Sequence, residues 1–178
     1  MKTGDNCLAQ AAAMGDAQAF ATLLDRHYDG LFALCFRLTG TRADAEDLTQ
    51  DICAALPDRL ASFRGEARFT TWLWRVAVNA AQDRRRRAAT HARHAGQWGD
   101  WERNRRDAAA ESGAAQDWLV AAMRALPEDL RDTLALVLDD TTQAQTAEIL
   151  GIPEGTVAWR VSQAKKRLRA LHAQEMQP

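Results

Sequence analysis

The chain is predicted to be all-α, with two small helical domains joined by a flexible linker. Ala, Leu, Arg, Asp and Glu dominate its 178 residues, Pro occurs 4 times and β-branched residues are few, a composition that favours helices. Apolar residues recur at helical spacing in both halves, but this periodicity vanishes over residues 88–116, which are rich in Ala, Arg, Gly, Asp and His. We therefore expect domains at residues 1–87 and 117–174, with 88–116 as the linker.

The N-terminal domain is expected to be a bundle of three helices, preceded by a short one. In order, the predicted helices are a short one at residues 8–14, one from an Asp16 cap to Gly40, one from Thr41 to near Leu60, and one that Thr70 or Thr71 caps. Cys35 and Cys53 fall on apolar helix faces, so we expect both to be small buried hydrophobic groups. Cys7 lies in a terminal segment that is expected to fray.

The C-terminal domain is expected to hold several helices and to end in a long one. Its predicted elements are a helix that begins at Trp118 and is broken at Pro127, a second carrying Leu130 to Leu138, a short helix at residues 142–150, a turn at 151–153, and a final helix from Glu154 to about Ala173. On the final helix, spacings of 3 and 4 predict one buried stripe. The stripe consists of Val157, Val161, Ala164, Leu168 and Leu171.

Residues 63–87 thread aromatic side chains among arginines and close on four consecutive arginines at positions 84–87. Bases can stack on aromatic rings while arginines hold the phosphate backbone, so the stretch has the makings of a single-strand nucleic-acid surface. The short helix, turn and long helix after residue 142 are typical of a helix-turn-helix, which places a helix in the major groove. Together the two features indicate a protein that opens duplex DNA at one place and reads it at another.

Charge and composition narrow the function further. The net charge is −1, but residues 64–93 and 159–178 are basic whereas 126–158 are acidic, so DNA contact is expected on two patches. We expect no catalytic site, metal or cofactor, because no glycine phosphate loop or serine elbow appears and His91 and His94 lack nearby ligands. Apolar runs such as Leu31 to Phe36 fall well short of the roughly 18 residues of a membrane span, so we expect a cytoplasmic chain without membrane insertion.

Four motifs in order resemble the sigma-70 family of bacterial RNA polymerase sigma factors, in its compact extracytoplasmic-function form. Residues 15–28 resemble the start of the family's region 2, and DAEDLTQD at 44–51 resembles its polymerase-binding helix. Residues 63–83 resemble the segment that reads and melts the −10 promoter element. Leu126-Pro127 with residues 147–157 resembles region 4, which reads the −35 element. The resemblance implies a region 2 bundle and a region 4 helix-turn-helix.

The resemblance also implies partners and site residues. The partners are core RNA polymerase, promoter DNA that is duplex at −35 and single-stranded at −10, and an anti-sigma factor. The implied polymerase-binding residues are Asp44, Glu46, Asp47, Gln50 and Asp51. The implied −10 contacts are Phe63, Arg64, Arg68, Phe69, Trp72, Arg75 and Asn79. The implied −35 contacts are Thr156, Trp159, Arg160, Ser162, Gln163, Lys166 and Arg167.

Several readings stay open at this stage. The residues at 44–51 alone also fit an ordinary solvated helix face, and Trp72 fits either a DNA contact or the core, with Trp74 the better core candidate. Trp98 and Trp101 fit local packing or docking on a partner. A stand-alone helix-turn-helix regulator is the alternative function, although nothing in the sequence marks an obvious dimerisation helix. The chain departs from the family at Thr141 to Gln143, Thr146 and Ala158-Trp159, which affects the promoter sequence preferred at −35.

Overall fold

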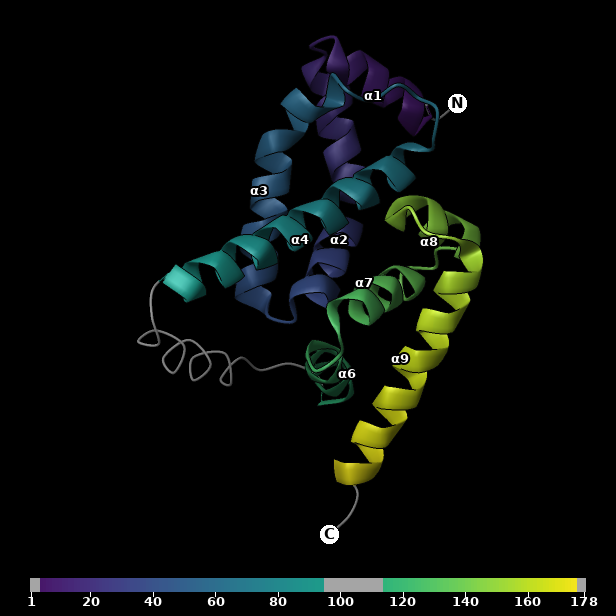
Figure 1. Cartoon of the computed structure of the whole chain (residues 1–178). Coiled ribbons are helices and arrows are strands. Elements are labelled where there is room, and N and C mark those ends of the chain that lie inside the picture. The colour runs from purple at the N-terminus through teal and green to yellow at the C-terminus, as the bar shows by residue number, and fades with distance from the viewer. Residues whose placement is uncertain (1–3, 95–113, 176–178) are drawn as a thin grey trace.

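A computed structural model describes residues 4–94 and 114–175, which form eight helices and no strand (Figure 1). The helices are α1 (Asp5–Ala13), α2 (Ala17–Thr39), α3 (Arg42–Leu60), α4 (Phe69–His94), α6 (Ala114–Arg124), α7 (Glu128–Val137), α8 (Gln143–Leu150) and α9 (Glu154–Glu175). The all-α prediction is therefore confirmed. None of these helices is long and apolar enough to cross a membrane.

Local cap residues fix the ends of α2 and α8 where the sequence predicts them. Asp16 begins α2, since its carboxylate accepts hydrogen bonds from the backbone N–H groups of residues 18 and 19, at 2.9 and 3.0 Å. Gly40 ends α2 in the left-handed conformation at φ 83°. Thr142 begins α8 in a reciprocal capping box with Gln145, and Gly151 ends α8 at φ 66°.

The start of α4 differs from the prediction. The helix begins at Phe69, so Thr70 and Thr71 lie inside its first turn instead of capping it. Asn6 of α1 supplies the missing cap: its side-chain carbonyl accepts the Phe69 N–H at 2.8 Å, and its amide group donates to the Ala67 carbonyl at 3.0 Å. The N-terminal segment is therefore tied to the loop before α4. Cys7 correspondingly lies exposed on helix α1, where the sequence predicted a frayed tail.

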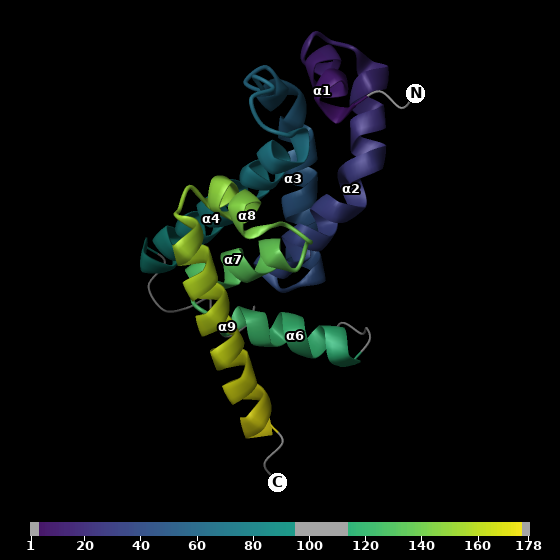
Figure 2. The same cartoon turned by 90° about the vertical axis from the view of Figure 1, so that its right-hand side faces the viewer.

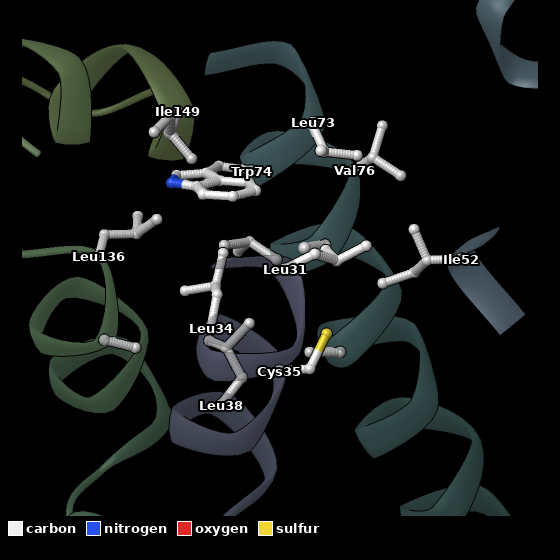
Figure 3. Packing of buried hydrophobic residues seen from close by; sticks show 14 of the residues in the cluster. Leu31, Leu34, Cys35, Leu38, Ile52, Leu73, Trp74, Val76, Leu136 and Ile149 are labelled. Atoms are coloured by element: carbon white, nitrogen blue, oxygen red, sulfur yellow. The ribbon is translucent and has the colours of Figure 1, made fainter. Parts of the chain in front are cut away.

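The apolar core is continuous across the two predicted domains. Helix α2 of the first domain contacts α6 and α7 of the second, and α4 contacts α8, which the views in Figures 1 and 2 both place against α4. Trp74 is 8% exposed and, as predicted, part of the core. It lies between Leu31 and Leu34 of α2 and Ile149 of α8 (Figure 3). Helix α9 extends away from the first domain, with its C-terminal end remote from α4 (Figure 1).

Candidate nucleic-acid interface

The acidic ridge on the first turns of α3 consists of Asp44, Glu46, Asp47, Gln50 and Asp51. All five are exposed except Asp44, which is half-buried. The hydroxyl of Thr41 orients Asp44, the first residue of the ridge. It accepts the Asp44 N–H at 3.1 Å and donates to the Asp44 carboxylate at 2.8 Å. The structure therefore brings together the side chains that the sequence assigned to polymerase binding, on one solvent-facing surface.

Arg84 of α4 lies beside the acidic ridge, a contact that helical periodicity within α3 could not reveal. Its Nη2 is 2.8 Å from Asp44 Oδ1 and 3.3 Å from Asp47 Oδ2. The Asp47 side chain is 67% exposed, so water screens this pair and its net contribution to stability is small, on the order of 0–1 kcal/mol. A basic surface of a partner could therefore replace Arg84 at low cost.

The structure corrects the role predicted for two aromatic rings of the −10 segment. Phe69 is 1% exposed and Phe63 is 8% exposed. They pack edge to face with ring centroids 5.8 Å apart, and the His27 ring lies 5.3 Å from Phe69. A base cannot stack on rings that the protein already covers. Phe63 and Phe69 instead stabilise the loop between α3 and α4 by packing against each other in the core.

The outward surface of the −10 segment is formed by the remaining predicted residues. Trp72 is half-buried, with its ring 5.5 Å from Phe63, so it belongs partly to the aromatic cluster and partly to the surface. Arg64, Arg68 and Asn79 are exposed. These side chains supply a partly open ring, two cations and an amide, the chemical groups needed to stack on a base, hold phosphate and read a base edge.

Arg75, another predicted −10 contact, is occupied by the second domain. Its Nη2 donates to the backbone carbonyl of Glu148 at 2.8 Å and lies 3.8 Å from that residue's carboxylate. Glu148 belongs to α8, the first helix of the helix-turn-helix. The helix that carries the predicted −10 residues is thus packed against the helix that precedes the predicted −35 residues.

Four of the seven side chains predicted to read DNA lie exposed on the outward face of α9, and the other three are half-buried. The buried stripe predicted for α9 is confirmed at Val157 and Ala164, which are fully buried, whereas Val161, Leu168 and Leu171 are only half-buried. On the other side Trp159 is 57% exposed, and Ser162, Lys166 and Arg167 are also exposed. Thr156 and Gln163 are half-buried, and Arg160 lies 3.5 Å from Asp129 of α7. An exposed Trp beside hydroxyl, amide and cationic groups is suited to a DNA groove.

Two threonines where the chain departs from the family pattern form the inner corner of the helix-turn-helix. The hydroxyl of Thr141 donates to the Leu136 carbonyl at 2.8 Å, and it lies 2.8 Å from the Thr146 hydroxyl. Thr146 is fully buried, so this hydrogen bond satisfies a polar group that would otherwise be costly to bury. Thr141 and Thr146 therefore contribute to the fold of the motif, whereas Trp159, another departure from the family, is exposed.

A polar cluster that the sequence did not reveal joins the two domains. Arg85 of α4 donates to Asp132 of α7 at 2.6 Å, and Gln82 donates to the same carboxylate at 3.1 Å. Arg37 of α2 donates to the Ala135 carbonyl at 3.1 Å and pairs with Asp139. Burial raises the pKa of Asp132, although Arg85 and Gln82 both act to lower it. The two domains are therefore held against each other by charged groups as well as by apolar packing. We call this packing of α6, α7 and α8 on α2 and α4 the closed arrangement.

Metal-binding chemistry finds no support in the described residues, where no group of three or more His, Cys, Asp and Glu side chains converges. The three cysteines are free. Cys35 is buried as predicted, and burial raises its thiol pKa to about 11, so it stays protonated and unreactive at neutral pH. Cys53 is only half-buried. Trp98 and Trp101 lie outside the described residues.

Comparison with known families and proteins agrees with this geometry. The model of sigma-70 region 2 matches residues 23–91, and that of sigma-70 region 4 matches residues 116–168. The chain therefore belongs to the sigma-70 family, among its ECF RNA polymerase sigma factors. Sigma factors are transcription initiation factors and not enzymes.

Individual relatives are similar over most of their length. The ECF RNA polymerase sigma factor SigM of Mycobacterium tuberculosis is 34% identical, over 92% of this chain and 82% of its own. SigW of Bacillus subtilis is 28% identical, over 87% and 89%. The solved structure of CnrH in complex with the cytosolic domain of CnrY matches with a TM-score of 0.69 and 26% identity, over 95% of this chain and 97% of that one. The sigma factor RpoE of Bartonella quintana, solved with the anti-sigma factor NepR, has the same fold with a TM-score of 0.71 at 22% identity, over 91% of this chain and 100% of that one.

Proposed function

We propose that this chain binds core RNA polymerase and directs promoter-specific initiation of transcription. Residues 1–87 would bind the polymerase and read and melt the −10 element, and residues 117–174 would read the −35 element. The linker expected at 88–116 is helical at both ends, since α4 continues to His94 and α6 begins at Ala114, so residues 95–113 would link the two parts. The observation that carries the proposal is the combination, in one sigma-family chain, of an exposed acidic ridge and two separate DNA-suited faces.

The acidic ridge is the proposed polymerase contact. Its carboxylates point to solvent, and their one described partner on another helix, Arg84, forms pairs that a basic surface can displace. The carboxylates also steer a basic partner over a distance, which speeds association at low salt. Core polymerase would then exchange an internal ion pair for several intermolecular ones.

Each of the two DNA faces is proposed to bind one promoter element. On the −10 side, Arg64 and Arg68 are proposed to hold phosphates, Asn79 to read a base edge, and Trp72 to stack or wedge. On the −35 side, Gln163 is the proposed base reader because an amide can bind adenine bidentately, and Lys166 and Arg167 are proposed to bind phosphates. Trp159 is placed to pack on a thymine methyl group or a sugar.

Reading both elements at once requires the closed arrangement to open. Positions −35 and −10 are separated by about 85 Å of duplex at 3.4 Å per base pair. A compact chain of this length has a radius of gyration of only about 16 Å, so its two DNA faces cannot reach both elements while α8 packs on α4. An extended chain of the length of residues 95–113 reaches about 65 Å, which allows the domains to separate. Arg75 would be released from Glu148 in that step.

An anti-sigma factor is the proposed regulator, and the cytoplasm the proposed location. Support comes from CnrH and the Bartonella sigma factor, whose structures were solved in complex with CnrY and with NepR respectively. If the two domains separate as proposed, the surfaces through which they now contact each other become available to such a partner.

The second candidate is a stand-alone helix-turn-helix regulator, favoured only by the exposed face of α9. A gel-shift experiment with and without core polymerase separates the two. A sigma factor shifts promoter DNA strongly only when core polymerase is present. A regulator shifts duplex DNA by itself, and the addition of core polymerase leaves its affinity unchanged.

A further inference from the structure

A cavity of about 370 Å³ lies where the two domains meet, and arginines line it. We call it the arginine cavity. Its lining residues are Leu38, Thr39, Asp44, Ala81, Arg84, Arg85, Ala88, Arg124 and Arg131. The four arginines come from α4, α6 and α7, so both domains contribute positive charge. Asp44 is the only carboxylate among these residues.

The most buried arginine of the cavity, Arg131, lacks a hydrogen-bond partner for its Nε. Arg131 is 9% exposed and forms no ion pair with another described residue. Nε and Nη1 of Arg85 are likewise buried without a hydrogen bond. Burial lowers the pKa of Arg131 and so does the nearby charge of Arg85, while Asp132 and Glu128 act in the opposite direction. Buried charged donors without acceptors are costly, so an acceptor in the cavity would stabilise the fold.

The acidic groups nearby are already engaged. Asp44 pairs with Arg84, as does Asp47 outside the cavity. Asp132 and Glu128 both pair with Arg85, at 2.6 and 3.3 Å. Among the described residues no acceptor forms a hydrogen bond with Arg131, although Oδ1 of the neighbouring Asp132 is also buried without a hydrogen-bond partner. The cavity beside Arg131 has room for a ligand.

We propose that the arginine cavity is a binding site for a small phosphate-bearing anion that bridges the two domains. Guanidinium groups bind phosphate oxygens in pairs, and a phosphate or diphosphate group offers enough acceptors for several arginines at once. The volume suits a group of that size and is too small for a helix of a protein partner, which is about 10 Å across. Because Arg85 belongs to one domain and Arg131 to the other, the bound anion stabilises the closed arrangement.

Calorimetric titration of the isolated chain with inorganic pyrophosphate tests the site without polymerase or DNA. Each titration is matched in ionic strength with NaCl, and thermal unfolding is followed in parallel, since a ligand of the folded state raises the Tm. The parent chain should bind saturably. Arg131→Gln should weaken binding about tenfold or more, the equivalent of one lost charged hydrogen bond. Arg124→Gln, at a more exposed position, should also weaken it and serves if the buried variant does not fold.

Arg86→Gln is the matched control, because Arg86 lies on the same helix but is 73% exposed, pairs with Asp83 and does not line the cavity. It should bind pyrophosphate within about twofold of the parent chain. Titration with ADP and with inorganic phosphate shows which chemical group the cavity binds. Equal binding of ADP and pyrophosphate assigns the site to a diphosphate group. Tighter binding of ADP than of pyrophosphate indicates an additional contact with the base or ribose. Absence of saturable binding, or equal binding by the parent, Arg131→Gln and Arg124→Gln, would overturn the proposal and leave the proposed sigma function untouched.

Discussion

Gly40 shows how one residue serves both the end of a helix and the contact between domains. It ends α2 at φ 83°, and a methyl group on its Cα would collide with Cγ and Cδ of Arg124 on α6. Gly151 ends α8 with a similar φ of 66°, but nothing lies within 4 Å of the place where its methyl group would be. The two glycines therefore share a backbone requirement and differ in their surroundings.

Gly40→Ala should destabilise the chain more than Gly151→Ala. Each substitution forces a left-handed alanine, at a cost of about 1–2 kcal/mol, and only Gly40→Ala adds overpacking of about 1–3 kcal/mol. The measurement is the free energy of unfolding in denaturant. In a double-mutant cycle, Arg124→Ala should recover the overpacking share and not the backbone share. Equal destabilisation by the two glycine variants would mean that Arg124 moves aside freely.

Substitutions at Asn79 and Phe69 should distinguish residues of the −10 segment that contact DNA from residues that support its fold. Asn79 is exposed, so Asn79→Ala should change the free energy of unfolding by less than about 0.5 kcal/mol. It should nevertheless reduce the permanganate reactivity of thymines near −10 in the holoenzyme, because a base contact of about 1–3 kcal/mol is lost. Phe69→Ala should instead destabilise the fold by about 3–5 kcal/mol, since the ring is 1% exposed.

A pre-melted promoter provides the control for these two variants. Asn79→Ala should impair the opening of duplex promoter more than binding to the pre-melted one. Equal loss on both templates would contradict a role of Asn79 in opening. Trp72 is half-buried, so its removal mixes both effects and makes it the less informative position.

The sequence predicts those helix ends and helix faces that depend on residues close together in the chain. The ends of α2 and α8 follow from cap residues adjacent in sequence, and the burial of Val157 and Ala164 on α9 follows from its apolar spacing. The start of α4 could not be predicted, because its cap, Asn6, belongs to another helix. Nor could the burial of Phe63, since a residue in a loop has no periodicity to show which way its side chain points.

Helix α9 offers a separate prediction for sequence reading at −35. Gln163→Ala should relax base preference at one position of the −35 element, whereas Lys166→Ala should weaken transcription from all promoters alike and reduce the dependence on salt. A randomised −35 library transcribed by holoenzyme with each variant measures both effects. An unchanged selected motif with Gln163→Ala would show that the register proposed for α9 in the groove is wrong.

The packing of the two domains is the feature of the whole molecule that the sequence did not reveal. Trp74 could be predicted to be buried, but its contact with Ile149 of α8 depends on how two distant segments meet. The same is true of Arg85 and Asp132, whose pairing is set by the tertiary fold and not by local spacing. Each side chain taken alone fits an ordinary helix face. The closed arrangement and the arginine cavity therefore became visible only in the structure.

Opening of the closed arrangement can be followed by energy transfer between dyes on the two domains. Suitable sites are Asp58 of α3 and Arg169 of α9, both exposed, each changed to Cys in a Cys7→Ser background. Transfer should fall below its value in the free chain when core polymerase and promoter DNA are added, because the two DNA elements lie about 85 Å apart. Unchanged transfer in a transcribing complex would contradict domain separation.

The most direct test of the central claim is transcription by core polymerase from a library of randomised promoter fragments, with and without this chain. The account predicts transcripts that depend on the chain, start at defined positions and share two separated sequence elements. Asp47→Arg provides the control, since it reverses an exposed charge of the acidic ridge and should abolish these transcripts while leaving the free energy of unfolding within about 0.5 kcal/mol. Absence of chain-dependent start sites, with binding of duplex DNA by the chain alone, would contradict the assignment as a sigma factor.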